Sequence, residues 1–132
     1  MSRENLDAVE RLYASWERGD LSGLHDLLHP DVEYVNPAGA IEPGVRHGLP
    51  AFEEAIRKLQ EAGESWRMYP ERFVASGDQV AVEVRYEARA RSSGITVQGR
   101  ESALVTLRDG RVVTFEWFHD PGDAFAAAGL DA

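Results

Sequence analysis

The chain has 132 residues, of which 43% are hydrophobic, and it combines 14 lysines and arginines with 23 aspartates and glutamates, a formal net charge of −9. This acidic balance disfavours nucleic acids and anionic membranes as partners, because both would repel the protein. The chain has no cysteine, which excludes disulfides, thiolate nucleophiles and cysteine-ligated zinc.

The first residues contain no apolar signal-peptide core, and no run approaches the length that spans a membrane. No internal repeat and no linker-like composition divides the chain. We therefore expect a single cytoplasmic domain over residues 1–132, long enough to bury its own core.

Three helices are predicted in the first half of the chain. Residues 6–16 carry apolar side chains at helical spacing, and Gly19-Asp20 is expected to end this helix and begin a second. The second helix is short and stops at His29, because a proline follows. Residues 49–63 have the pattern of a third amphipathic helix that a glycine closes.

A strand is predicted between the second and third helices, with Val32, Tyr34 and Asn36 on one face. It runs into a Gly/Pro-rich loop, residues 37–48, which we interpret as a mobile rim. A polar side chain at the end of this strand can therefore reach the space that the helices cover.

From Trp66 onward the hydrophobic period becomes two, which predicts an antiparallel meander. Its strands are expected at residues 66–75 with a bend at Pro70, 80–88, 95–107 and 112–119.

The turn between the last two strands fixes the expected register. Arg108-Asp109-Gly110 suits a type I turn followed by a glycine bulge. This register sets Ala103 opposite Phe115 and Glu101 opposite Trp117, with all four side chains on one face.

Together these elements predict an α+β fold, a cone-like α+β barrel. A strongly curved antiparallel sheet and three amino-terminal helices enclose a pocket at its open end. After the sheet, a short helix is expected to end at Gly129.

The chain resembles the SnoaL-like branch of the nuclear transport factor 2-like superfamily. The segments that carry this resemblance are LYASWERGDLSGLHDLLHPDVEYVNP, VRHGLPAFEEAI, GDQVAVEVRYEARARSSG, LRDGRVVTFEWFHD and AFAAAGL. The resemblance covers nearly the whole chain and implies the fold, but this fold serves isomerases, dehydratases, cyclases, epoxide hydrolases and non-catalytic binders.

The resemblance also implies that the chain is not a standard ketosteroid isomerase. The tyrosine that stabilises the oxyanion in that family falls on Leu12, although Tyr13 is adjacent. The aspartate base falls on Asn36, and the protonated aspartate of the oxyanion hole falls on Ala103. An amide cannot take up a proton as a carboxylate does, and a methyl group donates nothing.

Glu101 and His119 are the predicted proton-handling pair. A carboxyl at Glu101 would face the helices, and burial there would raise its pKa toward neutrality. The alternative is a rim position, or an ion pair with Arg85 or Arg100. His119 is expected near the mouth of the pocket, where it either shuttles protons or only caps the strand end. SnoaL-type cyclases use a late carboxylate and a histidine, so Asp120 is an alternative to Glu101.

Asn36 is predicted to orient a carbonyl or a water in the pocket, or else to serve the turn before its proline. Five aromatic residues are expected to line the pocket, although residues of this type at such spacing are often plain core. They are Tyr13, Trp16, Trp66, Tyr86 and Trp117.

No metal or cofactor is expected. His25 and His29 stand four residues apart, a spacing that can hold a metal on a helix, but no acidic residue of a zincin motif lies between them. No serine-centred elbow and no phosphate-cradling glycine loop is present in the sequence.

These observations predict a small-molecule pocket protein that performs cofactor-free general acid–base chemistry on an apolar carbonyl or cyclic compound, as an isomerase, cyclase, dehydratase or hydrolase. The alternative is a non-catalytic ligand-binding or dimerisation module of the same fold. Since the helices cover one side of the sheet, and since a second subunit commonly covers the other in this superfamily, we also predict a homodimer. Leu104 and Phe118, on the convex face, would form its apolar centre.

Overall fold

The computed structural model describes residues 2–17, 25–38, 43–62, 65–89 and 93–130. Its elements in chain order are α1 (Ser2–Glu17), β1 (Leu28–Asn36), β2 (Gly44–His47), α2 (Leu49–Ala62), β3 (Ser65–Ser76), β4 (Gln79–Arg89), β5 (Thr96–Arg108), β6 (Arg111–Phe118) and α3 (Asp123–Ala127). These elements make an α+β fold, as the sequence predicts.

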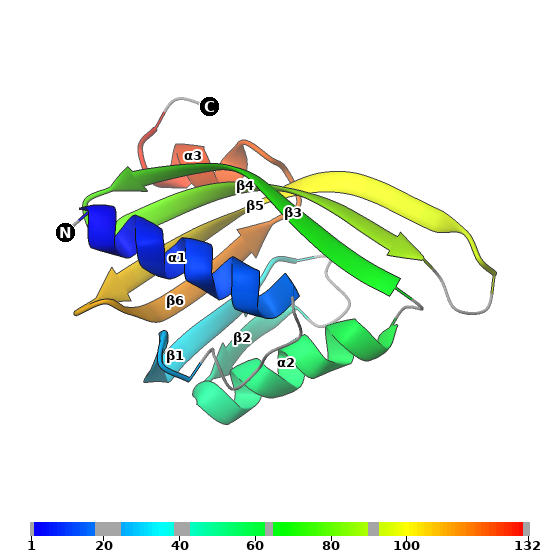
Figure 1. Cartoon of the computed structure of the whole chain (residues 1–132), viewed down its shortest axis with the longest axis horizontal. Helices are drawn as coiled ribbons and strands as arrows, with labels where there is room; N and C mark the ends of the chain where they lie inside the picture. The colour runs from blue at the N-terminus through cyan, green and yellow to red at the C-terminus, as the bar shows by residue number, and fades with distance from the viewer. Residues whose placement is uncertain (1, 18–24, 39–42, 63–64, 90–92, 131–132) are drawn as a thin grey trace.

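The strands form one curved sheet in the order β2-β1-β6-β5-β4-β3 (Figure 1). Strands β3 to β6 are antiparallel neighbours, with a bulge between Pro70 and Arg72 where the sequence predicts a bend. β1 instead pairs with β6 in parallel, and β2 forms an edge strand within the predicted rim loop. The sheet is therefore mixed, and the prediction of an antiparallel sheet is wrong on this side. A parallel pair requires a long connection, which α2 and the strands β3 to β5 supply.

The hairpin between β5 and β6 differs from its predicted register. Asp109 and Gly110 alone make the turn, and both have positive φ, 53° and 79°. Such angles define a type I′ turn, whose twist matches that of the strands. The turn sets Arg108 opposite Arg111, and a β-bulge between Thr106 and Leu107 shifts the register by one more residue, so Ala103 pairs with Trp117 and not with Phe115. Because the total shift is two residues, the side chains keep the predicted face.

The helical prediction is correct for two of the three expected elements. α1 and α2 follow the predicted apolar stripes, and they share one core with the sheet. Residues 18–24, which include the first part of the second expected helix, lie outside the described residues. The described part of that segment is a turn at residues 25–27, and β1 begins at Leu28. The predicted helix end at His29 is therefore wrong, because Leu28 is a buried strand residue that pairs with Val112.

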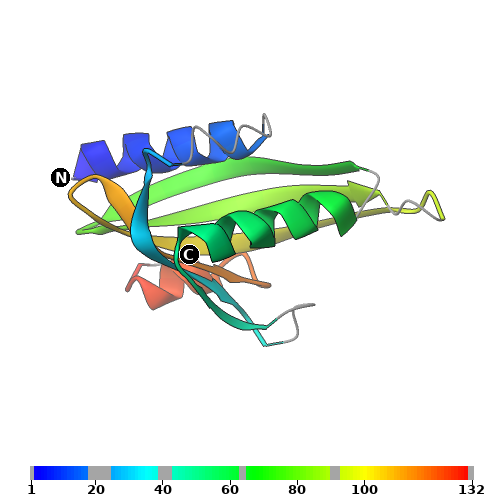
Figure 2. The same ribbon diagram turned by 90° about the horizontal axis from the view of Figure 1, so that it is seen from below.

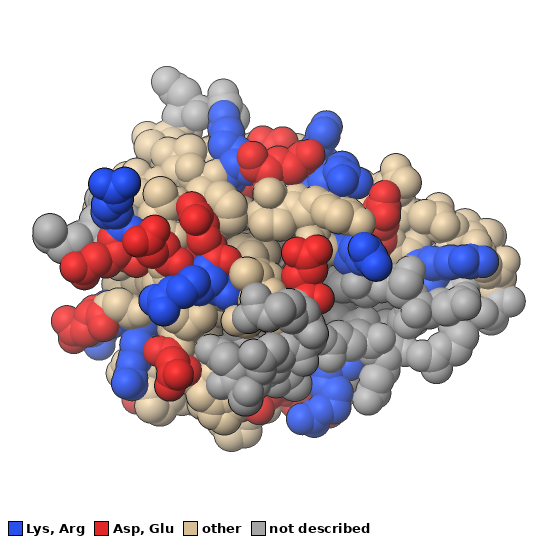
Figure 3. All heavy atoms as spheres, viewed as in Figure 1, with Lys and Arg blue, Asp and Glu red and all other residues tan. Residues whose placement is uncertain are grey.

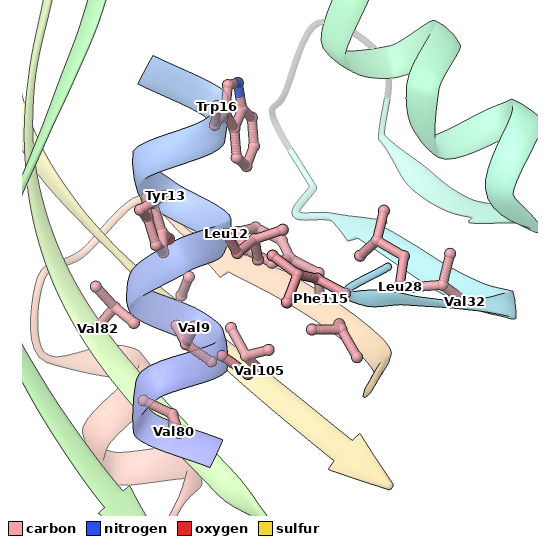
Figure 4. Packing of buried hydrophobic residues seen from close by; sticks show 14 of the residues in the cluster. Val9, Leu12, Tyr13, Trp16, Leu28, Val32, Val80, Val82, Val105 and Phe115 are labelled. Atoms are coloured by element: carbon pink, nitrogen blue, oxygen red, sulfur yellow. The ribbon is translucent and has the colours of Figure 1, made fainter. Parts of the chain in front are cut away.

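The main core lies between α1, α2 and the concave face of the sheet. Figure 4 shows side chains of α1 pointing toward Phe115 on β6. The ring of Phe115 lies 6.1 Å from Tyr13, 5.6 Å from Trp16 and 6.0 Å from Phe52, measured between centroids. One aromatic side chain of the sheet thus joins both helices in a single cluster.

The short helix α3 lies on the opposite side of the sheet from α1 (Figure 2). Phe125 of α3 is fully buried in a second cluster with Ala81 and Leu104. Phe118 packs against this cluster. The residues predicted to form the apolar centre of a dimer are thus covered by the chain's own carboxy-terminal helix.

Acidic and basic side chains alternate on the face shown in Figure 3. Ion pairs also link side chains of β3, β4 and β5. Glu71 lies 3.6 Å from Arg85 and 3.1 Å from Arg100, and Glu83 lies 3.9 Å from Arg100. Exposed ion pairs of this kind each contribute little to the stability of the fold. Arg85 and Arg100 are thus paired with glutamates of β3 and β4.

Candidate functional site

A small cavity of about 60 Å³ lies between α1, β1 and the concave face of the sheet. Its walls are almost entirely apolar. Glu101 and Trp117 are only partly buried, whereas every other side chain of the lining is buried, so these two mark its open side. The lining residues are Tyr13, Trp16, Tyr34, Met68, Val84, Glu101, Ser102, Ala103, Phe115 and Trp117.

Among the described residues of this lining, Glu101 is the one that carries a carboxyl group. It lies on β5 opposite Val84, and strand alternation directs it to the concave face. Burial in these apolar surroundings raises the pKa of Glu101 from 4.5 to about 7. Within the described part of the chain, its carboxyl forms no ion pair or hydrogen bond. Arg85 and Arg100 pair with other glutamates, so Glu101 is not their partner.

Two tyrosine hydroxyls border the same cavity as Glu101. Burial, and then the nearby charge of Glu101, raise the pKa of Tyr13 and of Tyr34 above the ordinary value of 10. A hydrogen bond with Trp117 and the charge of Arg46 act on the pKa of Tyr34 in the opposite direction. Both tyrosines therefore remain protonated hydroxyl groups at neutral pH.

Tyr34 was not predicted as a site residue. The signal for it was present in the strand pattern, because Tyr34 shares a face with Val32 and Asn36 and follows the helices that cover this face. Its ring lies 5.0 Å from Phe52 and 5.7 Å from Phe115, between centroids.

Trp117 is held by Asn36 at the open side of the cavity. The indole Nε1 of Trp117 donates a hydrogen bond to Oδ1 of Asn36 at 2.5 Å. Asn36 itself is not among the lining residues. Its amide thus orients a wall of the cavity, whereas the prediction had it orient a carbonyl or a water.

His119 lies on the outer side of this wall. It is exposed, and its ring stands edge-on to Trp117 with 5.0 Å between centroids. His119 does not appear among the residues described as lining the cavity. β6 ends at Phe118, so strand alternation no longer directs the next side chain inward.

The alternative carboxylate, Asp120, has a local structural role. Its Oδ1 accepts a hydrogen bond from the backbone N–H of Gly122 at 2.8 Å, and its carbonyl accepts one from Oγ of Ser102 at 2.6 Å. Ser102 Oγ also accepts the N–H of Ala124 at 3.1 Å. Asp120 is exposed, so these contacts dock α3 and place no carboxylate in the cavity.

Three of the five predicted pocket aromatics line the cavity, namely Tyr13, Trp16 and Trp117. Tyr86 packs against the core but is absent from the lining, and it lies beneath Gly99 on the neighbouring strand. The backbone of Trp66 belongs to β3, while its side chain lies outside the described residues. The indole N–H of Trp16 is buried with no hydrogen-bond partner among the described residues.

The two histidines with metal-like spacing have other partners. Nε2 of His25 lies 2.8 Å from Oε1 of Glu53, and Nδ1 of His29 accepts the backbone N–H of Asp31 at 3.0 Å. Across the described ranges, no group of three or more acidic or histidine side chains is placed to hold a metal. No helix in those ranges is both long and apolar enough to cross a membrane.

The fold is that of a known family. A family model described as a SnoaL-like domain matches residues 9–115. The chain therefore belongs to the SnoaL-like family, within the NTF2-like fold. It is 30% identical to the uncharacterized protein Rv0034 of Mycobacterium tuberculosis, over 89% of this chain and 90% of the relative.

Two solved structures share the whole architecture. An NTF2-like protein of unknown function from Burkholderia pseudomallei is 26% identical, with a TM-score of 0.80 over 93% of this chain and 95% of that one. TerC, co-crystallized with polyporic acid, is 27% identical, with a TM-score of 0.80 over 95% of this chain and 97% of that one.

Proposed function

We propose that this protein binds a small, mostly apolar carbonyl or cyclic compound in the cavity and transfers a proton to or from it through Glu101, without a cofactor. The observation that carries the proposal is a carboxyl with a pKa of about 7, placed in an apolar cavity without a basic partner among the residues that the structure describes. A general acid or base works best when its pKa lies near the working pH. TerC, a relative over nearly its whole length, was co-crystallized with polyporic acid, which supports a small organic ligand here.

In the proposed step, the ionised Glu101 takes a proton from the carbon next to a carbonyl. The electron pair of the broken C–H bond moves to the carbonyl oxygen and forms an enolate. Tyr13 and Tyr34 border the same cavity with hydroxyls that stay protonated, so they supply hydrogen bonds to that oxygen. Return of the proton to another carbon, or its exchange with solvent, completes the reaction.

We assign the proton transfer to Glu101 alone. His119 lies outside the wall that Trp117 forms, and Asn36 holds that wall through the indole N–H. An aromatic ring requires a cavity on the order of 150 Å³, more than the space present here. Ligand entry therefore requires a wall to move, and Trp117 is the partly buried aromatic side chain of the lining.

Exchange of the methyl protons of acetophenone in D2O tests this proposal. Followed by NMR, the exchange should be faster with the protein than with buffer, and it should rise with pH through about 7 as Glu101 ionises. Glu101→Gln should lose about 100-fold or more of this acceleration. Glu116→Gln is the matched control, because Glu116 lies on β6 between two lining residues and so points to the opposite face.

The competing function is ligand binding without turnover. Acetophenone that binds, as judged by its NMR line width, but exchanges no faster than in buffer would favour this binding module and refute the catalytic proposal. Equal exchange rates in the wild type and Glu101→Gln would remove Glu101 from the mechanism.

A further inference from the structure

Among the described residues that line the cavity, none places a basic side chain beside Glu101. The side chains that border the cavity with it come from each packed element and include no basic group: Tyr13 from α1, Tyr34 from β1, Met68 from β3, Val84 from β4 and Trp117 from β6. Tyr13 and Tyr34 are the titratable groups that face it, and both stay neutral. The charge of Arg46 lowers the pKa of Tyr34. His119 stands edge-on to Trp117 and is not among the described lining residues. A cation in the cavity would supply a positive charge that the described lining residues do not provide.

The walls of the cavity suit an organic cation. Five aromatic rings border it, those of Tyr13, Trp16, Tyr34, Phe115 and Trp117. The face of an aromatic ring carries partial negative charge, and sets of such rings bind alkylammonium groups by cation–π attraction. An inorganic cation would instead need several oxygen ligands, whereas Glu101 is the one carboxylate of the lining.

Long-range charge also favours a cation. An alkylammonium head group with several methyls is about as bulky as an aromatic ring, so its entry into the cavity of about 60 Å³ also requires the Trp117 wall to move. The protein carries a net charge of −9, which attracts cations and repels anions.

We propose that this cavity is a binding site for a small organic ammonium ion of the trimethylammonium class, with Glu101 as its counterion. Binding needs no proton transfer to or from the ligand. Cation binding is therefore a separate property of the same cavity. An experiment can refute the proposed reaction without refuting cation binding, and the reverse.

The proposal predicts that binding is linked to release of a proton. The ligand binds the ionised form of Glu101, and the free protein holds a proton there with a pKa of about 7. A ligand whose own charge does not titrate should therefore bind about 10-fold more tightly at pH 8 than at pH 6.

The experiment compares choline with 3,3-dimethyl-1-butanol, in which a carbon replaces the charged nitrogen. Their affinities are measured by NMR titration of the methyl protons at pH 6 and pH 8. Choline should bind more tightly than the neutral alcohol, and its methyl resonance should move upfield because aromatic rings surround it. Glu101→Gln should remove both the preference for choline and its pH dependence, while Glu116→Gln should retain them.

Several outcomes would overturn the proposal. They are equal affinities for choline and the alcohol, no binding of either, or a preference for choline that persists in Glu101→Gln. Proton exchange of acetophenone, measured separately, reports on the proposed reaction. Choline binding without ketone exchange would leave this site standing and refute the reaction, and the reverse result would do the opposite.

Discussion

The burial of Glu101 should make the protein less stable as the pH rises from about 4.5 to 7. Below pH 4.5 the folded and unfolded states both hold the proton. Between the unfolded pKa of 4.5 and the folded pKa of about 7, the unfolded chain releases the proton while the folded protein keeps it. The unfolded state binds fewer protons in this window, so the free energy of unfolding falls with pH. Above pH 7 both states are ionised and the loss stays constant.

A pKa that rises from 4.5 to about 7 corresponds to about 3 kcal/mol of unfolding free energy. This is an upper limit, because Glu101 keeps some contact with solvent at the open side of the cavity. Urea unfolding of the wild type and of Glu101→Gln between pH 4 and pH 8 measures it. Taking the difference between the two proteins removes the titration of every other group that behaves alike in both.

The stability of the wild type relative to Glu101→Gln should decrease by up to about 3 kcal/mol over this range, with most of the change between pH 4.5 and 7. Glu116→Gln, the control from the opposite face, should run parallel to the wild type. Parallel curves for the wild type and Glu101→Gln would show that Glu101 is solvated, and would refute the account of the cavity.

Three further predictions concern the wall, the carboxy-terminal helix and assembly. Asn36→Ala removes the acceptor of the Trp117 N–H and should cost about 1 kcal/mol in urea unfolding, whereas Asn36→Asp keeps an acceptor oxygen; an equal loss in both variants would contradict this role. Ser102→Ala leaves the buried N–H of Ala124 without its partner and should cost about 1–3 kcal/mol; an unchanged midpoint would show that α3 is docked by apolar contacts alone. A homodimer through the convex face would be formed by α3 and the charged strands, and light scattering should give about twice the chain mass of 14.6 kDa; a mass of one chain would refute it.

The sequence predicts the parts of this fold that depend on local periodicity. The apolar stripe from Leu6 to Trp16 and the alternation from Val80 to Ala88 appear as α1 and β4. The pairing of strands that are far apart in the sequence could not be predicted in this way. The parallel contact of β1 with β6 joins residues about eighty positions apart, for example Tyr34 with Phe115, and no local pattern in either strand specifies it.

Strand parity predicts which face a site residue occupies, whereas its role stays a prediction. Glu101 lies at the cavity because its face follows from alternation, and because the turn at Asp109 and the bulge between Thr106 and Leu107 together shift the register by two residues. Strand parity gives no prediction beyond the end of a strand. His119 lies one residue beyond β6, so its parity no longer fixes its direction. The role of Asn36 could not be read from the sequence either, because its partner Trp117 is distant along the chain.

A direct titration of Glu101 measures the raised pKa on which both proposals depend. The side-chain carboxyl carbon of Glu101, labelled with 13C and assigned by its loss in Glu101→Gln, is followed by NMR from pH 3 to pH 9 without ligand. Because burial raises the pKa of Glu101, we expect a midpoint near pH 7, well separated from those of exposed glutamates. A midpoint near 4.5 would mean that water solvates the carboxyl in the free protein, and it would contradict both the acid–base role and the site for an organic cation.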